Sequence, residues 1–319
     1  MNRTKVEKLL GKRVTVTLTD GDIITGKLHK TGEEEFKDNP NLYEPEDYYF
    51  CIKPTGYTLF RCSQIRFLKE RDIKKKYELT KETITTLGGR KLHRIRALKN
   101  FADVKVGDLG GFVEKEKNLS QQGDCWVYDD AKVYEQSKVY DNAQIRNDAE
   151  VYGHSKVYGN AKVFGNAQIY HYAEIYDEAE VFYTAVVYDE AKVYGIAQVN
   201  GCSKVCNQAL VMDHAVINSS LISRNALICN NAFVQNATIS LDAKITDRNN
   251  YITINNFGSN NETITAFTTK NGEIYVKGYS FDSTLSEFIQ EVKKMPDGSK
   301  FTKEYLLVIE LIKAHFDIN

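Results

Sequence analysis

The chain has 319 residues, and its 42 lysines and arginines nearly balance its 43 aspartates and glutamates, which leaves a formal net charge of −1. This balance excludes a wholly basic nucleic-acid coat and an acidic solvating tail, although a local charged patch remains open. Hydrophobic residues make up 42% of the sequence, close to the globular norm, so intrinsic disorder is not expected. The length predicts two or three domains, at roughly 100–200 residues each.

The sequence carries no targeting signal that we recognise. Its first residues lack an apolar signal segment, and no stretch reaches the ~18 apolar residues of a membrane span. The cysteines form no CxxC pair, so we expect reduced thiols, no structural zinc site and a cytoplasmic protein without a membrane partner. They are Cys51, Cys62, Cys125, Cys202, Cys206 and Cys229.

Residues 1–76 have the pattern of a small β-barrel. A short helix precedes about five short strands, with a tight-turn signal at Asp20-Gly21 and a polar loop at 32–45 that contains Glu33, Glu34 and Glu35. The strands are expected at 14–18, 23–28, 48–52, 57–61 and 64–68.

Two segments of this part resemble the signatures of the Sm/LSm small barrel. They are GKRVTVTLTDGDIITGKL and FRCSQIRFL, where Cys62 replaces the usual glycine. The base-holding loop of the RNA-binding members is not visible, since the corresponding stretch is EPEDYYF. The resemblance implies a barrel that often forms rings, with Arg61 and Arg66 as possible nucleic-acid contacts and RNA as a possible partner.

Residues 77–124 are expected to form a connector that caps the next part. Apolar alternation on both sides of Gly88-Gly89 predicts a hairpin over 78–98. Three further glycines, Gly107, Gly110 and Gly111, are expected in turns. They do not form a phosphate loop, because no Lys-Ser/Thr pair follows them.

A six-residue repeat over 125–250 is the strongest signal in the chain. Every sixth residue from Val127 to Ile217 is Val or Ile, usually followed by Tyr or Phe, and a small residue stands four places after each aliphatic one. Two five-residue steps carry the series on to Ile245. A four-residue strand and a two-residue corner, repeated three times, close a coil of eighteen residues, so we expect about seven coils.

This pattern resembles the hexapeptide-repeat, left-handed parallel β-helix. The resemblance and the patterns together predict a mainly β protein, with an Sm-like barrel, a central β-helix and a C-terminal cap. The cap, at 251–319, is expected to contain a β-hairpin turning at Asn271-Gly272 and two helices. Ser283 is expected to begin the first helix, which runs to about Lys294, and the second runs over about 302–315.

Phasing the repeat by eighteen residues sorts the outward aromatic side chains into ladders. These ladders either stabilise the repeat surface or form a contact surface for subunits or a ligand. With Arg146, Lys156 and Lys192, they are candidates to stack on bases and neutralise phosphates. One ladder contains Tyr134, Tyr152, Tyr170 and Tyr188, a second contains Tyr140, Tyr158, Tyr176 and Tyr194, and the third face is mixed, with Tyr128, Arg146, Phe164, Phe182 and Asn200.

Two histidines fall on one corner of successive coils. His154 and His171 lie there, with Asp189 and Glu190 on the next coil, which makes them weak candidates for a catalytic base or a metal ligand. Histidine also suits corner positions for structural reasons, and no third histidine is in register. We therefore expect no metal and no cofactor.

Residues 77–319 also resemble a hexapeptide-repeat family of phages and prophages of Gram-positive bacteria. The resemblance is carried by LHRIRALKNFADVKVGDLGGFVEKEKNLSQQGDCWVYDDA, by the VYxxA array, and by the C-terminal KNGEIYVKGYS and FTKEYLLVIELIKAHF. It implies a phage setting and a location in the cytoplasm of the bacterial host cell.

The favoured function is that of a non-catalytic, homo-oligomeric binding protein, a trimer or larger. Its target would be a host protein or a nucleotide-type small molecule, and its most specific role counter-defence. Two alternatives remain open. One is a structural protein of a virion or scaffold, and the other is an acyltransferase of the hexapeptide type.

Overall fold

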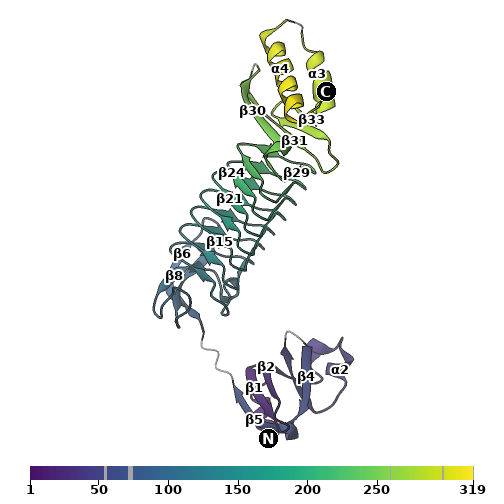
Figure 1. Ribbon diagram of the computed structural model, residues 1–319. Coiled ribbons are helices and arrows are strands. Elements are labelled where there is room, and N and C mark those ends of the chain that lie inside the picture. The colour runs from purple at the N-terminus through teal and green to yellow at the C-terminus, as the bar shows by residue number, and fades with distance from the viewer. Residues whose placement is uncertain (54–55, 71–74, 259, 297, 319) are drawn as a thin grey trace. The chain divides into compact units, whose positions relative to one another are not determined.

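The structure is a computed structural model, which describes residues 1–53, 56–70, 75–258, 260–296 and 298–318 (Figure 1). The chain divides into two compact units, Met1–Lys74 and Lys75–Asn319. Among the described residues, no helix has both the length and the apolar character needed to cross a membrane.

The first unit is a five-stranded antiparallel sheet in the order β4-β3-β2-β1-β5. Alternation in β1 buries Val14, Val16 and Leu18, because successive side chains of a strand point to opposite faces. The predicted helix and five strands are confirmed, and the likeness to the Sm family stays a prediction. The elements are α1 (Arg3–Glu7), β1 (Arg13–Leu18), β2 (Ile23–Lys30), η1 (Glu34–Phe36), α2 (Pro40–Tyr43), β3 (Tyr48–Lys53), β4 (Gly56–Arg61), η2 (Cys62–Gln64) and β5 (Ile65–Glu70).

The second unit is built around a parallel β-helix of about seven coils, which confirms the predicted architecture (Figure 1). Each coil contributes one short strand to each of three faces. Face 1 contains β10 (Lys132–Val133), β13 (Glu150–Val151), β16 (Gln168–Ile169), β19 (Val186–Val187), β22 (Lys204–Val205), β25 (Leu221–Ile222) and β28 (Thr238–Ile239).

Faces 2 and 3 each have seven strands. Face 2 contains β11 (Lys138–Val139), β14 (Lys156–Val157), β17 (Glu174–Ile175), β20 (Lys192–Val193), β23 (Leu210–Val211), β26 (Leu227–Ile228) and β29 (Lys244–Ile245). Face 3 contains β9 (Trp126–Val127), β12 (Gln144–Ile145), β15 (Lys162–Val163), β18 (Glu180–Val181), β21 (Gln198–Asn200), β24 (Val216–Asn218) and β27 (Phe233–Gln235).

The inside of the β-helix is filled by the repeated aliphatic and small residues. The Val and Ile positions and the Ala positions between them are essentially inaccessible to solvent. Where serine replaces alanine, the backbone satisfies its hydroxyl: Ser137 Oγ donates to the carbonyl oxygen of Tyr134 at 2.6 Å and to that of Val151 at 3.0 Å. The two five-residue steps keep the parallel register, because Lys204 pairs with Leu221, which pairs with Thr238.

The corners explain why Asp, Asn and Gly recur in the repeat. The residue two places after each aliphatic position from Val127 to Ile239 has a positive φ, such as +57° at Asp189 and +71° at Gly153. Asp and Asn tolerate this conformation, and their side chains accept hydrogen bonds from the backbone N–H one coil later. Asp189 Oδ2, for example, accepts from the amide of Asn207 at 3.1 Å.

The N-terminal end of the β-helix is closed by β6 (Tyr77–Thr85), β7 (Lys91–Ala97), β8 (Leu109–Val113) and η3 (Glu116–Asn118). Strand β8 pairs in parallel with β10, and β7 and β6 extend face 1 into a ten-stranded sheet. The expected hairpin is confirmed. Gly107 lies in a turn at φ +94°, but the expectation of turns was wrong for Gly110 and Gly111, which lie inside β8. A Cβ on Gly111 would be 2.4 Å from the carbonyl oxygen of Ala131, so close backbone approach requires glycine there.

A buried lysine closes this end of the core. Lys76 is inaccessible to solvent, and its Nζ donates to the carbonyl oxygens of Cys125 at 2.8 Å and Gly123 at 3.3 Å. The same ammonium lies 3.2 Å from Cys125 Sγ and 5.2 Å from the ring centroid of Phe101. One charged side chain therefore satisfies buried carbonyl groups where the repeat begins.

We expect Lys76→Met to lower the free energy of unfolding by about 1–3 kcal/mol, because it leaves these carbonyl groups without a donor. Urea denaturation followed by circular dichroism measures the change. Lys75→Met is the matched control, since Lys75 is exposed and pairs with Glu116 at the surface. Equal stability of the two variants would contradict this role for Lys76.

The C-terminal end carries the four-stranded antiparallel sheet β30-β31-β32-β33 and two helices. The two helices are confirmed, but the sheet has two strands more than the expected hairpin. The N-cap of the first helix is Thr284 and not Ser283 as expected, because the side chain of Thr284 accepts from the amide of Glu287 while the carboxylate of Glu287 accepts from the amide of Thr284. The elements are β30 (Tyr251–Phe257), β31 (Glu262–Thr268), β32 (Ile274–Gly278), β33 (Asp282–Thr284), α3 (Leu285–Lys293) and α4 (Lys300–His315), preceded by η4 (Arg248–Asn250).

Candidate functional site

Both predicted tyrosine ladders are present on the β-helix. Their rings are nearly parallel, because equivalent outward positions repeat once per coil. The first tyrosine ladder, on face 1, has centroid distances of 5.0, 5.0 and 5.1 Å along Tyr134, Tyr152, Tyr170 and Tyr188. The second, on face 2, has distances of 4.8, 4.9 and 4.8 Å along Tyr140, Tyr158, Tyr176 and Tyr194.

The ladders leave little ring surface for a stacked base. Each inner ring faces a tyrosine on both sides, and spacings of about 5 Å do not admit another ring between them. A ligand on the flat part of either face would therefore contact ring edges and hydroxyl groups. The use of these tyrosines in binding stays a prediction.

The cations proposed to accompany the ladders already have partners. Arg146 lies over the ring of Tyr128 at 3.7 Å and pairs with Asp103 at 3.3 Å. Glu174 lies between Lys156 and Lys192 in the same column, with N–O distances of 2.7 and 3.6 Å. A phosphate group would have to compete with these carboxylates for each cation.

Burial raises the pKa of the ladder phenols. The pKa of Tyr152 rises to about 12, first through desolvation and then through the neighbouring Tyr170 and Glu150. The pKa of Tyr176 also rises to about 12, again mainly through desolvation. These hydroxyl groups therefore stay neutral over the whole physiological range.

We expect the β-helix to lose stability in alkali. Unfolded tyrosines release their protons near pH 10, whereas Tyr152 and Tyr176 retain theirs to about pH 12 in the folded state. Their contribution is therefore complete below pH ~10 and is lost as the pH rises toward 12.

The ultraviolet absorbance of tyrosinate, recorded together with circular dichroism, tests this expectation. Part of the phenolate signal should appear only at a pH well above 10, together with the loss of β structure. Tyr152→Phe should reduce the alkaline loss of stability. Titration of all 20 tyrosines near pH 10 with the fold intact would contradict the prediction.

A cleft lies between the tip of the β6–β7 hairpin and the first tyrosine ladder. This hairpin cleft measures about 550 Å³, and Leu87, at the hairpin tip, is fully exposed beside it. Tyr134 packs in a small apolar cluster with Leu92 and Phe112, which joins the ladder to the hairpin. The residues lining the cleft include Leu87, Arg90, Lys132, Tyr134, Glu150 and Tyr152.

The charges of the hairpin cleft compensate one another. Arg90 pairs with Glu114 and Glu135, both at 3.1 Å. Lys132 Nζ lies 2.8 Å from Glu150, which also accepts from the hydroxyl of Tyr134 at 3.0 Å. The cleft therefore offers apolar and hydrogen-bonding surface rather than a free net charge. The tyrosines of the cleft and the hairpin itself were both predicted from the sequence. The position of the hairpin over the ladder was not, because it depends on contacts distant in sequence.

The two corner histidines have different surroundings. The His154 ring stacks on Tyr172 at 5.0 Å, with its backbone amide donating to the carbonyl oxygen of His171. His171 Nδ1 lies 2.9 Å from Asp189 Oδ1, and Asp189 Oδ2 accepts from the side chain of Asn207 at 2.9 Å.

His171 and Asp189 border a shallow groove of about 570 Å³, the corner groove. A carboxylate that orients an exposed imidazole is an arrangement able to support general-base chemistry. The groove is lined by His171, Tyr172, Asp189, Glu190, Asn207 and Gln208.

The two arginines proposed for RNA lie on the first unit. Arg61, at the end of β4, covers the ring of Tyr48 at 4.6 Å. Arg66, in β5, lies 5.5 Å from the ring centroid of Phe67, which is itself exposed. Their role in binding nucleic acid stays a prediction.

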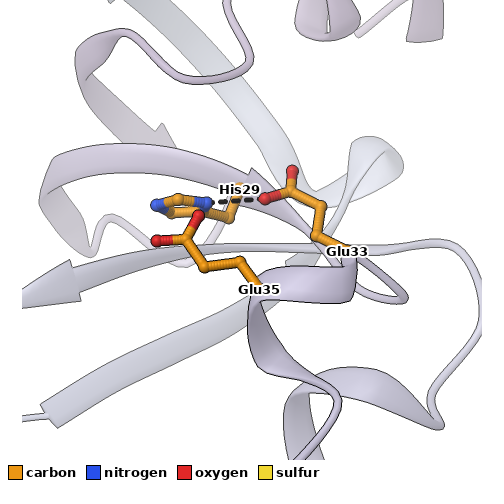
Figure 2. A group of neighbouring side chains, drawn as sticks. All are labelled: His29, Glu33 and Glu35. Atoms are coloured by element: carbon orange, nitrogen blue, oxygen red, sulfur yellow. Dashed lines mark hydrogen bonds and ion pairs between the residues drawn. The ribbon is translucent and has the colours of Figure 1, made fainter.

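One group of possible metal ligands occurs among the residues that the structure describes. His29, Glu33 and Glu35 place one ligand atom each within 4.8 Å of one another (Figure 2). From the sequence, the two glutamates were expected only as part of a polar loop. The four-residue spacing of His29 and Glu33 was no usable signal, because β2 ends at Lys30 and the contact depends on the turn that follows the strand.

A short stretch of the chain is similar to a known protein. It is 45% identical over 38 residues to a protein described as "Uncharacterized acetyltransferase YdcK" of Escherichia coli (strain K12). The match covers 12% of this chain and spans about an eighth of the relative's length. No family model matches the chain.

Proposed function

We propose that this chain is a non-catalytic binding protein and that its partner is another protein. The hairpin cleft carries the proposal, because an exposed leucine lies there beside an aromatic floor on a rigid scaffold. Large aromatic side chains and exposed apolar groups that converge on one patch are typical of protein interfaces.

The charge pairing favours a protein over a nucleotide as the partner. A nucleotide needs cations free to meet its phosphates, whereas Arg90 and Lys132 are both held by carboxylates. A protein surface can bury Leu87 and bond to the ring edges without disrupting these pairs. Sequestration of a nucleotide is thus the less supported form of the proposal.

Several finer parts of the proposal rest on the sequence resemblances alone. They are the phage or prophage setting, the counter-defence role, the assembly into a trimer or larger homo-oligomer, the location in the bacterial cytoplasm and the Sm-like character of the first unit. A structural role in a virion or scaffold is the alternative, and the regular β-helix would suit it as well.

We expect Leu87→Asp to weaken partner capture about tenfold or more in a pull-down from host lysate, because a charge would be buried in the interface. Val106→Asp is the matched control, because Val106 is another exposed apolar residue at the same end of the β-helix and does not line the hairpin cleft. Equal loss in both variants, or in neither, would remove the hairpin cleft as the binding surface.

Acyl transfer at the corner groove is a second candidate function. It is favoured by the His171–Asp189 pair, at 2.9 Å, and by the short similarity to an acetyltransferase. In this reaction His171 would take the proton of an acceptor hydroxyl or amine, while Asp189 would orient the imidazole. The coils around the groove follow one another without an inserted loop to enclose an acceptor.

If this second candidate is correct, His171→Ala should lower the rate of thiol release from acetyl-coenzyme A about 10²-fold, the usual contribution of a positioned base. His154→Ala serves as the control, because His154 stacks on Tyr172 and does not contact Asp189. A wild-type protein without activity, or a His171→Ala variant as active as wild type, would exclude this chemistry.

A further inference from the structure

The first unit contains a buried histidine that faces two carboxylates. We propose that His29, Glu33 and Glu35 bind a divalent transition-metal ion of the Zn²⁺ class. His29 lies near the end of β2, Glu33 in the turn that leads into η1 and Glu35 in η1 itself, and their side chains point toward one another (Figure 2). This site is independent of the surfaces on the β-helix and of the function proposed for them.

The imidazole of His29 is held rigidly. Only 3% of this residue is exposed, and its ring stacks on Phe50 at 5.3 Å and meets the edge of Phe36 at 4.8 Å. These two contacts fix the ring plane, so Nδ1 points to the carboxylate of Glu33 at 2.7 Å. A polar ring in an aromatic surrounding needs a strong partner, and a metal ion is one.

Glu33 is positioned by the backbone. Its Oε1 accepts from the amide of Lys30 at 2.9 Å, which leaves Oε2 beside the imidazole. Metal-ligating carboxylates are commonly held by such a second hydrogen bond, which orients the free oxygen toward the ion. The turn between β2 and η1 thus provides one ligand together with its support.

Glu35 completes the group from the solvent side. It lies in η1, its side chain is exposed, and one of its oxygens lies within 4.8 Å of the other two ligand atoms. A zinc ion with bonds of about 2.0–2.2 Å needs ligand atoms roughly 3.3 Å apart, so Glu33 has to withdraw slightly and Glu35 to approach. Rotation of two partly exposed carboxylates is sufficient for this, and water can occupy the remaining position.

The donor set selects the class of ion. One imidazole nitrogen and two carboxylate oxygens suit Zn²⁺ and its first-row neighbours, whereas Mg²⁺ and Ca²⁺ prefer oxygen alone. The ion would connect β2 to the turn at Glu33 and to η1. Binding would therefore stabilise this part of the fold.

Titration of the full chain with Co²⁺, a spectroscopic substitute for Zn²⁺, tests the proposal. The visible bands of Co²⁺ report its binding, and the charge-transfer band of thiolate-bound Co²⁺ distinguishes this site from binding to the cysteines. We expect one ion per chain without the thiolate band, displacement by Zn²⁺ and not by Ca²⁺, and a higher melting temperature of the first unit.

Glu35→Gln is the decisive variant, because the side chain is exposed and its replacement does not endanger folding. It should weaken Co²⁺ binding about tenfold or more, a loss at least as large as that from changing a residue that only orients a metal ligand. Glu34→Gln, the adjacent exposed glutamate outside the group, is the matched control and should bind like wild type. Absence of thiolate-free Co²⁺ binding, or equal affinity of the two variants, would overturn the proposal.

Discussion

The β-helix depends on turning a corner every six residues without leaving backbone groups unsatisfied. Each corner places one residue in the left-handed conformation, where Asp, Asn and Gly are favoured. The side chain of an Asp or Asn then bonds to the amide of the equivalent residue one coil later, as Asp141 does with Gly159. Closure of one coil and stacking of the next are thus achieved by the same residue.

The same regularity determines what the faces can offer to a partner. Equivalent positions of successive coils lie one strand spacing apart, so like aromatic rings stack and opposite charges pair along the columns. Side chains on the flat faces are therefore occupied by their own repeats. Hollows in the surface lie beside the hairpin that caps the N-terminal end of the repeat and at the corner where His171 is exposed.

The sequence predicted what is local and periodic. The register of the aliphatic residues and both tyrosine ladders followed from spacing alone, because each coil repeats the same short-range geometry. Gly110 and Gly111 were assigned to turns because their close approach to the first coil is visible only after the strand is placed against it. Lys76 is the last of three consecutive lysines, a pattern typical of exposed segments, although its ammonium is buried at the start of the core.

The candidate sites were less predictable where they depend on contacts that the repeat does not fix. His171 and Asp189 are eighteen residues apart and could be brought together from the period of the coil. No period exists in the first unit, where His29 meets Glu33 only because the chain turns directly after β2. A histidine in a strand and a glutamate in a loop have no fixed geometry in a sequence, whereas two residues of a repeat do.

Because the chain divides into two units, the proposed metal ion would stabilise only the first of them. A ligand stabilises the structure that it contacts, and its effect spreads only as far as folding is cooperative. His29, Glu33 and Glu35 all lie within Met1–Lys74, while the β-helix has a separate core of stacked aliphatic residues. The ion would thus control the order of the turn after β2 and leave the stability of the β-helix unchanged. A protein with this organisation can respond to metal in one unit while the other remains a constant, rigid scaffold.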